Sequence, residues 1–220
     1  KENMDERWGF ETRAIHAGQK PDPRTGAITV PVYQTTTYEQ DEVGKDRGYE
    51  YSRTGNPTRD ALEISVAALE GAEFGRAFAS GIAAEDTILR LLNPGDHIVM
   101  GNDAYGGTFR LISKVLTRMG VTWSAADFSK RENIENCVTD RTRVIWAETP
   151  SNPLLSIVDI QMLSEVAHSI GAWCVVDNTF ATPYLQQPLA HGAAFVVHSA
   201  TKYLGGHSDV VGGFIATNSS

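Results

Sequence analysis

The sequence predicts an α/β fold in which a parallel or mostly parallel sheet is covered by helices. From about residue 56 onward, segments with helical periodicity alternate with short apolar runs, and Gly, Pro and Asn residues separate the two kinds of segment. We expect six strands, at 97–100, 121–125, 143–147, 172–176, 194–197 and 213–217. This alternation is typical of strands that pair side by side through helical crossovers.

Four helices are expected around these strands. The first begins at Asn56 and Pro57, an N-cap and a first-turn residue, carries Leu62, Val66 and Leu69 on one face, and stops at Gly71. The others cover about 81–92, 107–119 and the segment between a capping Asp159 and Gly171. Residues 1–55 are rich in Gly, Pro, Thr and Tyr with weak periodicity, so we expect an N-terminal arm at 1–55 and a main domain at 56–220.

Charge and composition exclude several classes of function. The 220 residues carry 27 acidic and 19 basic side chains, a formal net charge of -8 that disfavours binding to nucleic acid or anionic membranes. No apolar stretch reaches the length of about 18 residues needed to span a bilayer, and the first residues lack the apolar middle of a secretion signal, so a cytoplasmic location is expected. Cys137 and Cys174 are far apart and indicate neither a disulfide framework nor a zinc site.

Polar residues follow three of the apolar runs directly, at the strand ends where doubly wound sheets bind their ligands. Asp177 follows 172–176, Lys202 lies in the polar segment after 194–197, and Glu148 follows 143–147. A lysine and a carboxylate from neighbouring strand ends suit a pyridine-ring cofactor, because the lysine forms an imine and the carboxylate keeps the ring nitrogen protonated.

A phosphate site is expected beside this pair. Ser199 and Thr201 bracket the same turn with hydroxyl donors, and Gly81 opens a helix whose free N–H groups favour a phosphate dianion. Each of these residues alone is also explained as a helix cap, a turn residue or a solvated side chain.

The segment SATKYLGGHSD at 199–209 resembles the lysine signature of the Cys/Met-metabolism PLP-dependent enzymes, the trans-sulfuration family. Further elements of that family follow the same order: GFETRAIHAG (9–18), YSRTGNPT (51–58), ASG (79–81), DAYGGT (103–108), ETPSNP (148–153) and VDNTFATP (176–183). The resemblance covers nearly the whole chain and implies pyridoxal 5'-phosphate (PLP) as cofactor. It also implies a three-layer α/β/α domain of fold-type I, similar to that of aspartate aminotransferase.

The resemblance also implies roles for individual residues. Lys202 resembles the lysine that forms the Schiff base, Asp177 the partner of the pyridine nitrogen, and Tyr105 the ring stacked on the cofactor. Residues that resemble the phosphate cup are Ser199, Thr201 and the backbone N–H groups of Gly81 and Ile82, where Ile82 replaces the family's usual methionine. Tyr51 and Arg53 resemble residues that reach the phosphate of the neighbouring subunit in a homotetramer built as a dimer of dimers. Asn152 resembles the residue near the ring hydroxyl and is also expected to contact the substrate.

The segment YGGTFRLI at 105–112 separates members of the family. Arg110 resembles an arginine of the cystathionine γ-synthases and γ-lyases and suits the distal carboxylate of a substrate. We expect Lys202, Tyr105 and Tyr51 to be catalytic, and the reaction to be γ-replacement of the γ-synthase type, from O-succinyl- or O-acetylhomoserine and cysteine to cystathionine. Cystathionine γ-lyase and O-acylhomoserine sulfhydrylase activities remain alternatives, and Arg110 is also explained as a solvated helix position.

Two other kinds of protein remain open. His191, His198, His207 and Asp209 offer donors for a metal-dependent hydrolase, but their spacing fits no standard ligand pattern, so no metal is expected. A binding fragment without turnover is the second alternative, because the family's smaller C-terminal domain, which binds the substrate α-carboxylate, is expected to lie outside this chain.

Overall fold

The structure is a computed structural model that describes residues 8–218. It divides into two compact units, one up to Leu69 and one from Glu70 onward. This division falls before the last residue of the second helix, whereas the sequence predicts a boundary after residue 55. Each unit is described by itself.

The first unit contains α1 (Phe10–His16) and most of α2 (Pro57–Glu70). α2 begins as expected, because the Asn56 Oδ1 atom accepts a hydrogen bond from the Thr58 N–H group at 2.9 Å and Pro57 needs no such partner. Gly18 has a φ of +74° and passes so close to α2 that a Cβ atom would lie 2.5 Å from the Ala61 carbonyl oxygen. A side chain at position 18 would therefore clash with the helix backbone.

The expected buried face of α2 is partly wrong. Leu62 is 51 % exposed, while Val66 is buried as predicted. Glu63 and Glu70 are buried instead, at 8 % and 1 % exposure. Hydrophobic periodicity assigns a glutamate to solvent, and only a paired carboxylate is buried in this way.

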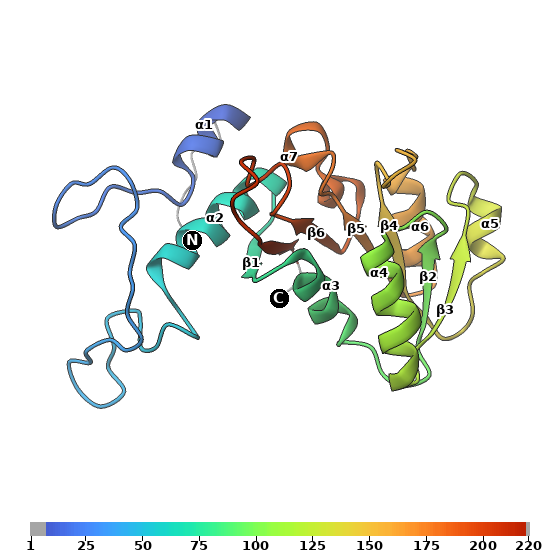
Figure 1. Ribbon diagram of the computed structural model, residues 1–220, viewed down its shortest axis with the longest axis horizontal. Helices are drawn as coiled ribbons and strands as arrows, with labels where there is room; N and C mark the ends of the chain where they lie inside the picture. The colour runs from blue at the N-terminus through green and yellow to red at the C-terminus, as the bar shows by residue number, and fades with distance from the viewer. Residues whose placement is uncertain (1–7, 219–220) are drawn as a thin grey trace. The chain divides into compact units, whose positions relative to one another are not determined.

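The second unit is built on a seven-stranded sheet with the order β1-β7-β6-β5-β4-β2-β3 (Figure 1). The strands are β1 (Phe74–Phe78), β2 (His97–Gly101), β3 (Thr122–Ala126), β4 (Thr142–Glu148), β5 (Trp173–Asp177), β6 (Phe195–Ser199) and β7 (Gly213–Thr217). All are parallel except β7, which runs antiparallel to both of its neighbours. The sheet is therefore mostly parallel, as the sequence predicts.

Helices cover both faces of this sheet and give it three layers (Figure 1). The helices and helical turns of this unit are α3 (Gly81–Leu89), α4 (Gly106–Arg110), a π-helical turn (Leu111–Val115), a 3₁₀ turn (Leu116–Met119), α5 (Arg131–Glu135), α6 (Ile160–Ser169), α7 (Thr182–Leu185) and a second 3₁₀ turn (Pro188–His191). Val175 and Val197 pack with α3 and the segment after α4, while Val176 packs with α5 and α6. Alternate residues of each strand thus face opposite helical layers.

The structure corrects three details of the expected elements. Six strands were expected, but β1 is a seventh, in which Gly75 and Arg76 interrupt the apolar run that would have identified it. The helix expected at 107–119 is one continuous helical segment that changes from α through π to 3₁₀ geometry and ends at Gly120, with a φ of +84°. The helix expected at about 81–92 ends at Leu89.

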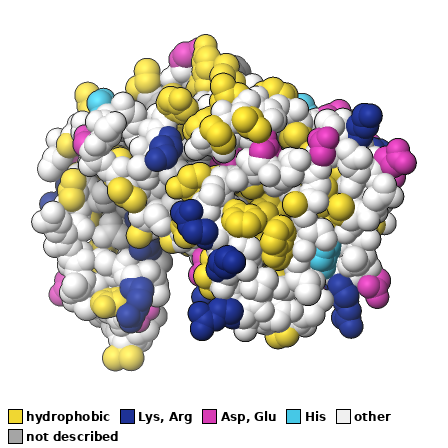
Figure 2. All heavy atoms as spheres, turned by 45° about the vertical axis from the view of Figure 1, so that its right-hand side comes forward, with side chains coloured by type: hydrophobic (Ala, Val, Ile, Leu, Met, Phe, Trp, Pro, Cys, Tyr) yellow, Lys and Arg dark blue, Asp and Glu magenta, His cyan; other side chains and the backbone are white. Residues whose placement is uncertain are grey.

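The surface carries charged side chains of both signs. Figure 2 shows Lys and Arg side chains and Asp and Glu side chains on the same face, separated by uncharged atoms. The excess of acidic residues therefore does not form one continuous patch on the face shown. Within residues 8–218, no helix is both long and apolar enough to cross a membrane.

Candidate active site

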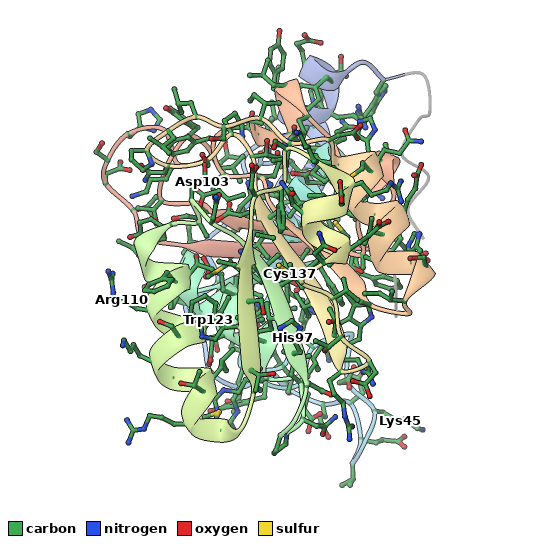
Figure 3. All side chains as sticks on the ribbon, turned by 90° about the vertical axis from the view of Figure 1, so that its right-hand side faces the viewer. Lys45, His97, Asp103, Arg110, Trp123 and Cys137 are labelled. Carbon is green, nitrogen blue, oxygen red and sulfur yellow. The ribbon has the colours of Figure 1, made fainter. Side chains whose placement is uncertain are left out.

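The candidate site lies at the carboxyl ends of the parallel strands. Figure 3 shows Asp103 just beyond the end of β2, whereas His97, the first residue of β2, lies at the opposite end of the sheet. The ends of β1, β4, β5 and β6 share the edge with Asp103, because these strands are parallel to β2. Residues that are far apart in the sequence thus meet at one edge.

Asp177 is the last residue of β5 and is 7 % exposed. Its Oδ1 atom accepts a hydrogen bond from the Thr179 N–H group at 2.9 Å. Burial raises the pKa of Asp177 above its usual value, while the hydrogen bonds from Thr179 and the charge of His198 lower it. A buried carboxyl at a strand end can pair with a cationic group placed over it.

Ser199, Thr201 and Lys202 lie in the turn that follows β6. The Ser199 N–H group donates to the Thr179 Oγ1 atom at 2.8 Å, which connects this turn to the end of β5. The Thr201 hydroxyl donates to the Gly212 carbonyl at 3.3 Å and accepts from the Gly212 N–H group at 3.1 Å. Lys202 is exposed, and its amine has no hydrogen-bond or ion-pair partner within residues 8–218.

The start of α3 forms a cradle next to Ser199. Ser80 caps the helix, with its Oγ atom accepting from the Ala83 N–H group at 3.1 Å. A Cβ atom on Gly81 would lie 2.9 Å from the Ser199 Cβ atom and 3.3 Å from its Oγ atom, so only glycine permits this approach. The N–H groups at the start of α3 and the Ser199 hydroxyl therefore lie close together, an arrangement of the kind that binds a phosphate.

Tyr105 connects the end of β2 with the end of β4. Its N–H group donates to the Glu148 Oε2 atom at 2.7 Å, and its side chain is 42 % exposed. The ring lies against Gly107, since a Cβ atom there would be 2.4 Å from the Tyr105 Cε1 atom and 3.0 Å from the Ile82 Cδ1 atom. Tyr105 and Ile82 thus lie near each other, at the starts of α4 and α3.

Three further carboxyl groups lie at this edge of the sheet: Glu85 is buried, Glu148 and Asp103 are half-buried, and of the three the sequence singled out only Glu148. Glu85 on α3 is 3 % exposed, and burial, followed by the charge of Asp177, raises its pKa to about 8. Burial and then Asp177 likewise raise the pKa of Glu148 to about 8. Asp103 accepts a hydrogen bond from the Ser151 hydroxyl at 2.5 Å. The position of Glu148 after an apolar strand was a usable signal, whereas Glu85 inside a helix offered none.

The remaining predicted residues take other positions. Asn152 is half-buried and donates its backbone N–H to Glu148. Arg110 is exposed and points away from the sheet (Figure 3), with one guanidinium nitrogen 3.3 Å from where a Cβ atom of Gly106 would be.

Tyr51 and Arg53 belong to the first unit, where the Arg53 guanidinium carbon lies 4.8 Å from the centre of the Tyr51 ring. This distance is typical of a cation–π contact.

The residues that could have served a metal-dependent hydrolase do not form a ligand set. Within the part of the chain that the structure describes, no group of three or more His, Cys, Asp or Glu side chains could hold a metal ion. His198 is fully buried and bonds to Glu70, while His207 bonds through its Nδ1 atom to the Gly205 carbonyl at 2.9 Å.

Comparisons with known proteins agree with this architecture. A family model described as Cys/Met metabolism PLP-dependent enzyme matches residues 11–220. A cystathionine gamma-synthase of Mycobacterium tuberculosis is 58 % identical over 212 residues, which are 96 % of this chain and 55 % of the relative. A cystathionine beta-lyase of Lactococcus lactis subsp. cremoris is 53 % identical over 211 residues, 96 % of this chain and 56 % of the relative.

Solved structures give the same result. The crystal structure of metB from Corynebacterium glutamicum superposes with a TM-score of 0.95 and 54 % identity, covering 97 % of this chain and 56 % of that one. A cystathionine gamma-lyase from Lactobacillus plantarum, complexed with L-serine, gives a TM-score of 0.93 and 49 % identity, covering 96 % and 55 %. The chain thus spans about half the length of the curated relatives it matches.

The residues at the strand ends fit the family's cofactor, PLP. The cradle at Gly81 suits its phosphate, the buried Asp177 suits its ring nitrogen, and the Lys202 amine is free to react with its aldehyde. The family model extends over most of the chain, and the fold agrees with its solved relatives. The chain therefore belongs to the Cys/Met metabolism family of PLP-dependent enzymes.

Proposed function

We propose that this chain is the cofactor-binding portion of an enzyme that makes cystathionine by γ-replacement, from O-succinyl- or O-acetylhomoserine and cysteine. The observation that carries the proposal is the position of Arg110. Its guanidinium is exposed and lies beside Gly106, the residue that follows Tyr105, and it has no carboxylate partner within residues 8–218. A guanidinium that is free near the Tyr105 segment suits a substrate with a second, distal carboxylate, such as a succinyl ester. The relative that is 58 % identical and named cystathionine gamma-synthase supports the same reaction.

Each residue of the site has a distinct task in this proposal. PLP, when bound, supplies an electron sink for the charge that develops when the amino acid loses a proton. Asp177 keeps the ring nitrogen protonated, and Ser199 with the N–H groups of Gly81 and Ile82 binds the phosphate. The Thr201 hydroxyl donates to the Gly212 carbonyl in this structure. After rotation of the Thr201 side chain, the hydroxyl would donate to the phosphate instead.

Lys202 and Tyr105 would carry out the proton transfers. The Lys202 amine would hold the cofactor and, when free, would move protons at Cα and Cβ of the substrate. The Tyr105 ring would cover the cofactor, and its hydroxyl could act as an acid or a base. Asn152 would lie near the ring hydroxyl. The γ-substituent would leave as a carboxylate, and the thiolate of cysteine would form the new bond at Cγ.

The oligomer is also a proposal. We propose a homotetramer, a dimer of dimers, in which Tyr51 and Arg53 reach the phosphate bound by the neighbouring subunit. The cation–π contact between these two side chains would hold the guanidinium in position for that phosphate. Tyr51 would also assist proton transfer in the partner's site.

Carbon–sulfur lyase activity is the second candidate. It is favoured by the 53 % identical relative named cystathionine beta-lyase and by the solved cystathionine gamma-lyase. Cleavage and γ-replacement begin with the same proton removal from the amino acid, so the residues described above serve both. O-acylhomoserine sulfhydrylase activity would differ only in using a smaller sulfur nucleophile.

A product assay separates these reactions. The whole protein that carries this chain is incubated with cysteine and either O-succinyl- or O-acetylhomoserine, and separately with cystathionine alone. Cystathionine should form with at least one of the two esters. Release of an oxoacid from cystathionine alone, without a replacement product, would favour the lyase and contradict the γ-synthase proposal.

A lysine variant tests the site itself. Lys202→Ala should lose the cofactor's imine absorbance and turnover, whereas Lys114→Ala, on the exposed side of the segment after α4, should keep both. A borohydride-reducible chromophore that persists in Lys202→Ala would show that another lysine carries the cofactor.

A further inference from the structure

A buried pair of ionisable side chains lies behind the candidate site. Glu70 is the last residue of α2 and His198 the fourth residue of β6, at 1 % and 0 % exposure. The His198 Nε2 atom hydrogen-bonds to the Glu70 Oε1 atom. Burying such a pair costs several kcal/mol unless further bonds compensate the loss of water. The pair therefore needs an explanation beyond simple packing.

A network of amide side chains extends from the pair. The Asn178 Nδ2 atom donates to the same Glu70 Oε1 atom at 2.8 Å and to the Gln186 carbonyl at 2.9 Å. The Gln186 Nε2 atom donates to the Asn178 Oδ1 atom at 2.8 Å and to the Thr149 carbonyl at 2.9 Å. The network thus connects β6 with the residues that follow β4 and β5.

The network does not satisfy all of its polar atoms. The Glu70 Oε2 and His198 Nδ1 atoms are buried and have no hydrogen-bond partner within the described protein. An apolar pair of similar volume would fill this place without leaving buried polar atoms unpaired. The stability of the fold alone therefore does not explain why a glutamate and a histidine occupy these two positions.

The two residues that bond to Glu70 are each next in sequence to a residue proposed to bind the cofactor. Asn178 follows Asp177, and His198 precedes Ser199. Asp177 pairs with Val197 in the sheet, and Val197 faces the α3 layer, so Asp177 and Ser199 face that layer as well. His198 points to the reverse face of the sheet. It thus lies behind the surface that carries Asp177 and Ser199.

The position of His198 affects the protonation of Asp177. Glu85 on α3 and Glu148 on β4 face Asp177, and burial followed by the charge of Asp177 raises the pKa of both carboxyls. Burial raises the pKa of Asp177 itself, whereas the hydrogen bonds from Thr179 and then the charge of His198 lower it. A carboxylate at Asp177 therefore gains support from the reverse side of the sheet.

We propose that Glu70 and His198 are positioning residues for the cofactor, which hold Asp177 in place relative to Ser199 from the reverse face of the sheet. The inference rests on the proposed roles of Asp177 and Ser199. Glu70 holds the imidazole, the imidazole supports the charge of Asp177, and the amides of Asn178 and Gln186 keep the strand ends aligned.

Two variants and a control test this inference in the whole protein. Glu70→Gln keeps the shape and one acceptor oxygen but removes the charge, and His198→Asn removes the imidazole. Val196→Ala, two residues before His198 on the same face of β6 and fully buried, is the control for lost packing. Cofactor-free protein is titrated with PLP, the absorbance of the bound cofactor is followed against pH, and thermal unfolding is recorded for each protein.

The expected result separates positioning from structure. Glu70→Gln and His198→Asn should each raise the dissociation constant for PLP about tenfold and move the midpoint of the absorbance change with pH by about one unit. Val196→Ala should lower the unfolding temperature without moving either quantity. If all three variants lower the unfolding temperature and none moves the midpoint or the dissociation constant, the pair is only structural and the inference is wrong.

A different result would contradict the proposed function. If the unchanged protein itself does not bind PLP, the assignment of Asp177 and Ser199 fails, and this inference fails with it. If the unchanged protein binds PLP and Glu70→Gln binds it equally well with the same pH midpoint, only the positioning role is overturned.

Discussion

Replacing Glu85 by glutamine should make the cofactor-free protein more stable near neutral pH. Glu85 lies on α3 with 3 % exposure, and its Oε2 atom has no hydrogen-bond partner within the described protein. Burial, and then the charge of Asp177, raises its pKa from the usual 4.5 to about 8. The folded protein therefore keeps a proton on Glu85 at a pH where the unfolded chain has released it.

The sign and size of the effect follow from this difference. Below pH 4.5 the carboxyl is protonated in both states and favours neither. Between 4.5 and about 8 only the unfolded chain releases the proton, so the stability of the fold falls as pH rises. The loss accumulates at about 1.4 kcal/mol per pH unit and amounts to about 3 kcal/mol between about pH 5 and pH 7.5. Glutamine cannot ionise, and Glu85→Gln should escape this loss.

Urea unfolding at a series of pH values measures the effect. Tryptophan fluorescence, to which Trp146 in the buried sheet contributes, reports the transition. The stability of the original protein should fall by about 3 kcal/mol more than that of Glu85→Gln between about pH 5 and pH 7.5. Asp86→Asn removes the neighbouring, partly exposed carboxyl of the same helix and should keep the original pH dependence. Parallel pH dependences for the original protein and Glu85→Gln would refute the buried, protonated state of Glu85.

Three further outcomes are expected. Iodoacetamide at about pH 8 should label Cys137 but not Cys174 in the native protein, as mass spectrometry would show, because burial raises the pKa of the Cys174 thiol to about 11. Gly213→Ala should cost about 1–3 kcal/mol in thermal unfolding, since its Cβ atom would lie 2.0 Å from a backbone oxygen, while Gly212→Ala, whose nearest neighbour is at 3.6 Å, should be close to neutral. Thr179→Val should weaken PLP binding about tenfold in a titration, whereas Thr179→Ser, which keeps the hydroxyl, should not.

Local sequence patterns predicted most of the second unit. Six of its seven strands and its longer helices are found where apolar runs and periodic segments place them. The Asp159 side chain caps α6 as expected, accepting from the Met162 N–H group at 3.0 Å. These features depend on neighbours within a few residues, which the sequence shows directly.

Local sequence patterns did not predict features that depend on residues far away in the sequence. β1 is short and contains Gly75 and Arg76, and it becomes a strand by pairing with β7, more than a hundred residues further along the chain. Glu70, a charged residue, looks like a surface position of an amphipathic helix and is buried because His198 and Asn178 bond to it. Neither pairing leaves a periodic signal.

The sequence by itself determined the fold class, the family and the strand-end positions of Asp177 and Lys202, because strand periodicity and motif order are properties of the chain. Only the tertiary structure decided which groups surround Asp177. Glu85 comes from a helix, Glu148 from β4 and His198 from β6, and the electrostatic interactions between these groups and Asp177 depend on distance and burial. Distance and burial between segments arise only when the strands are assembled into a sheet.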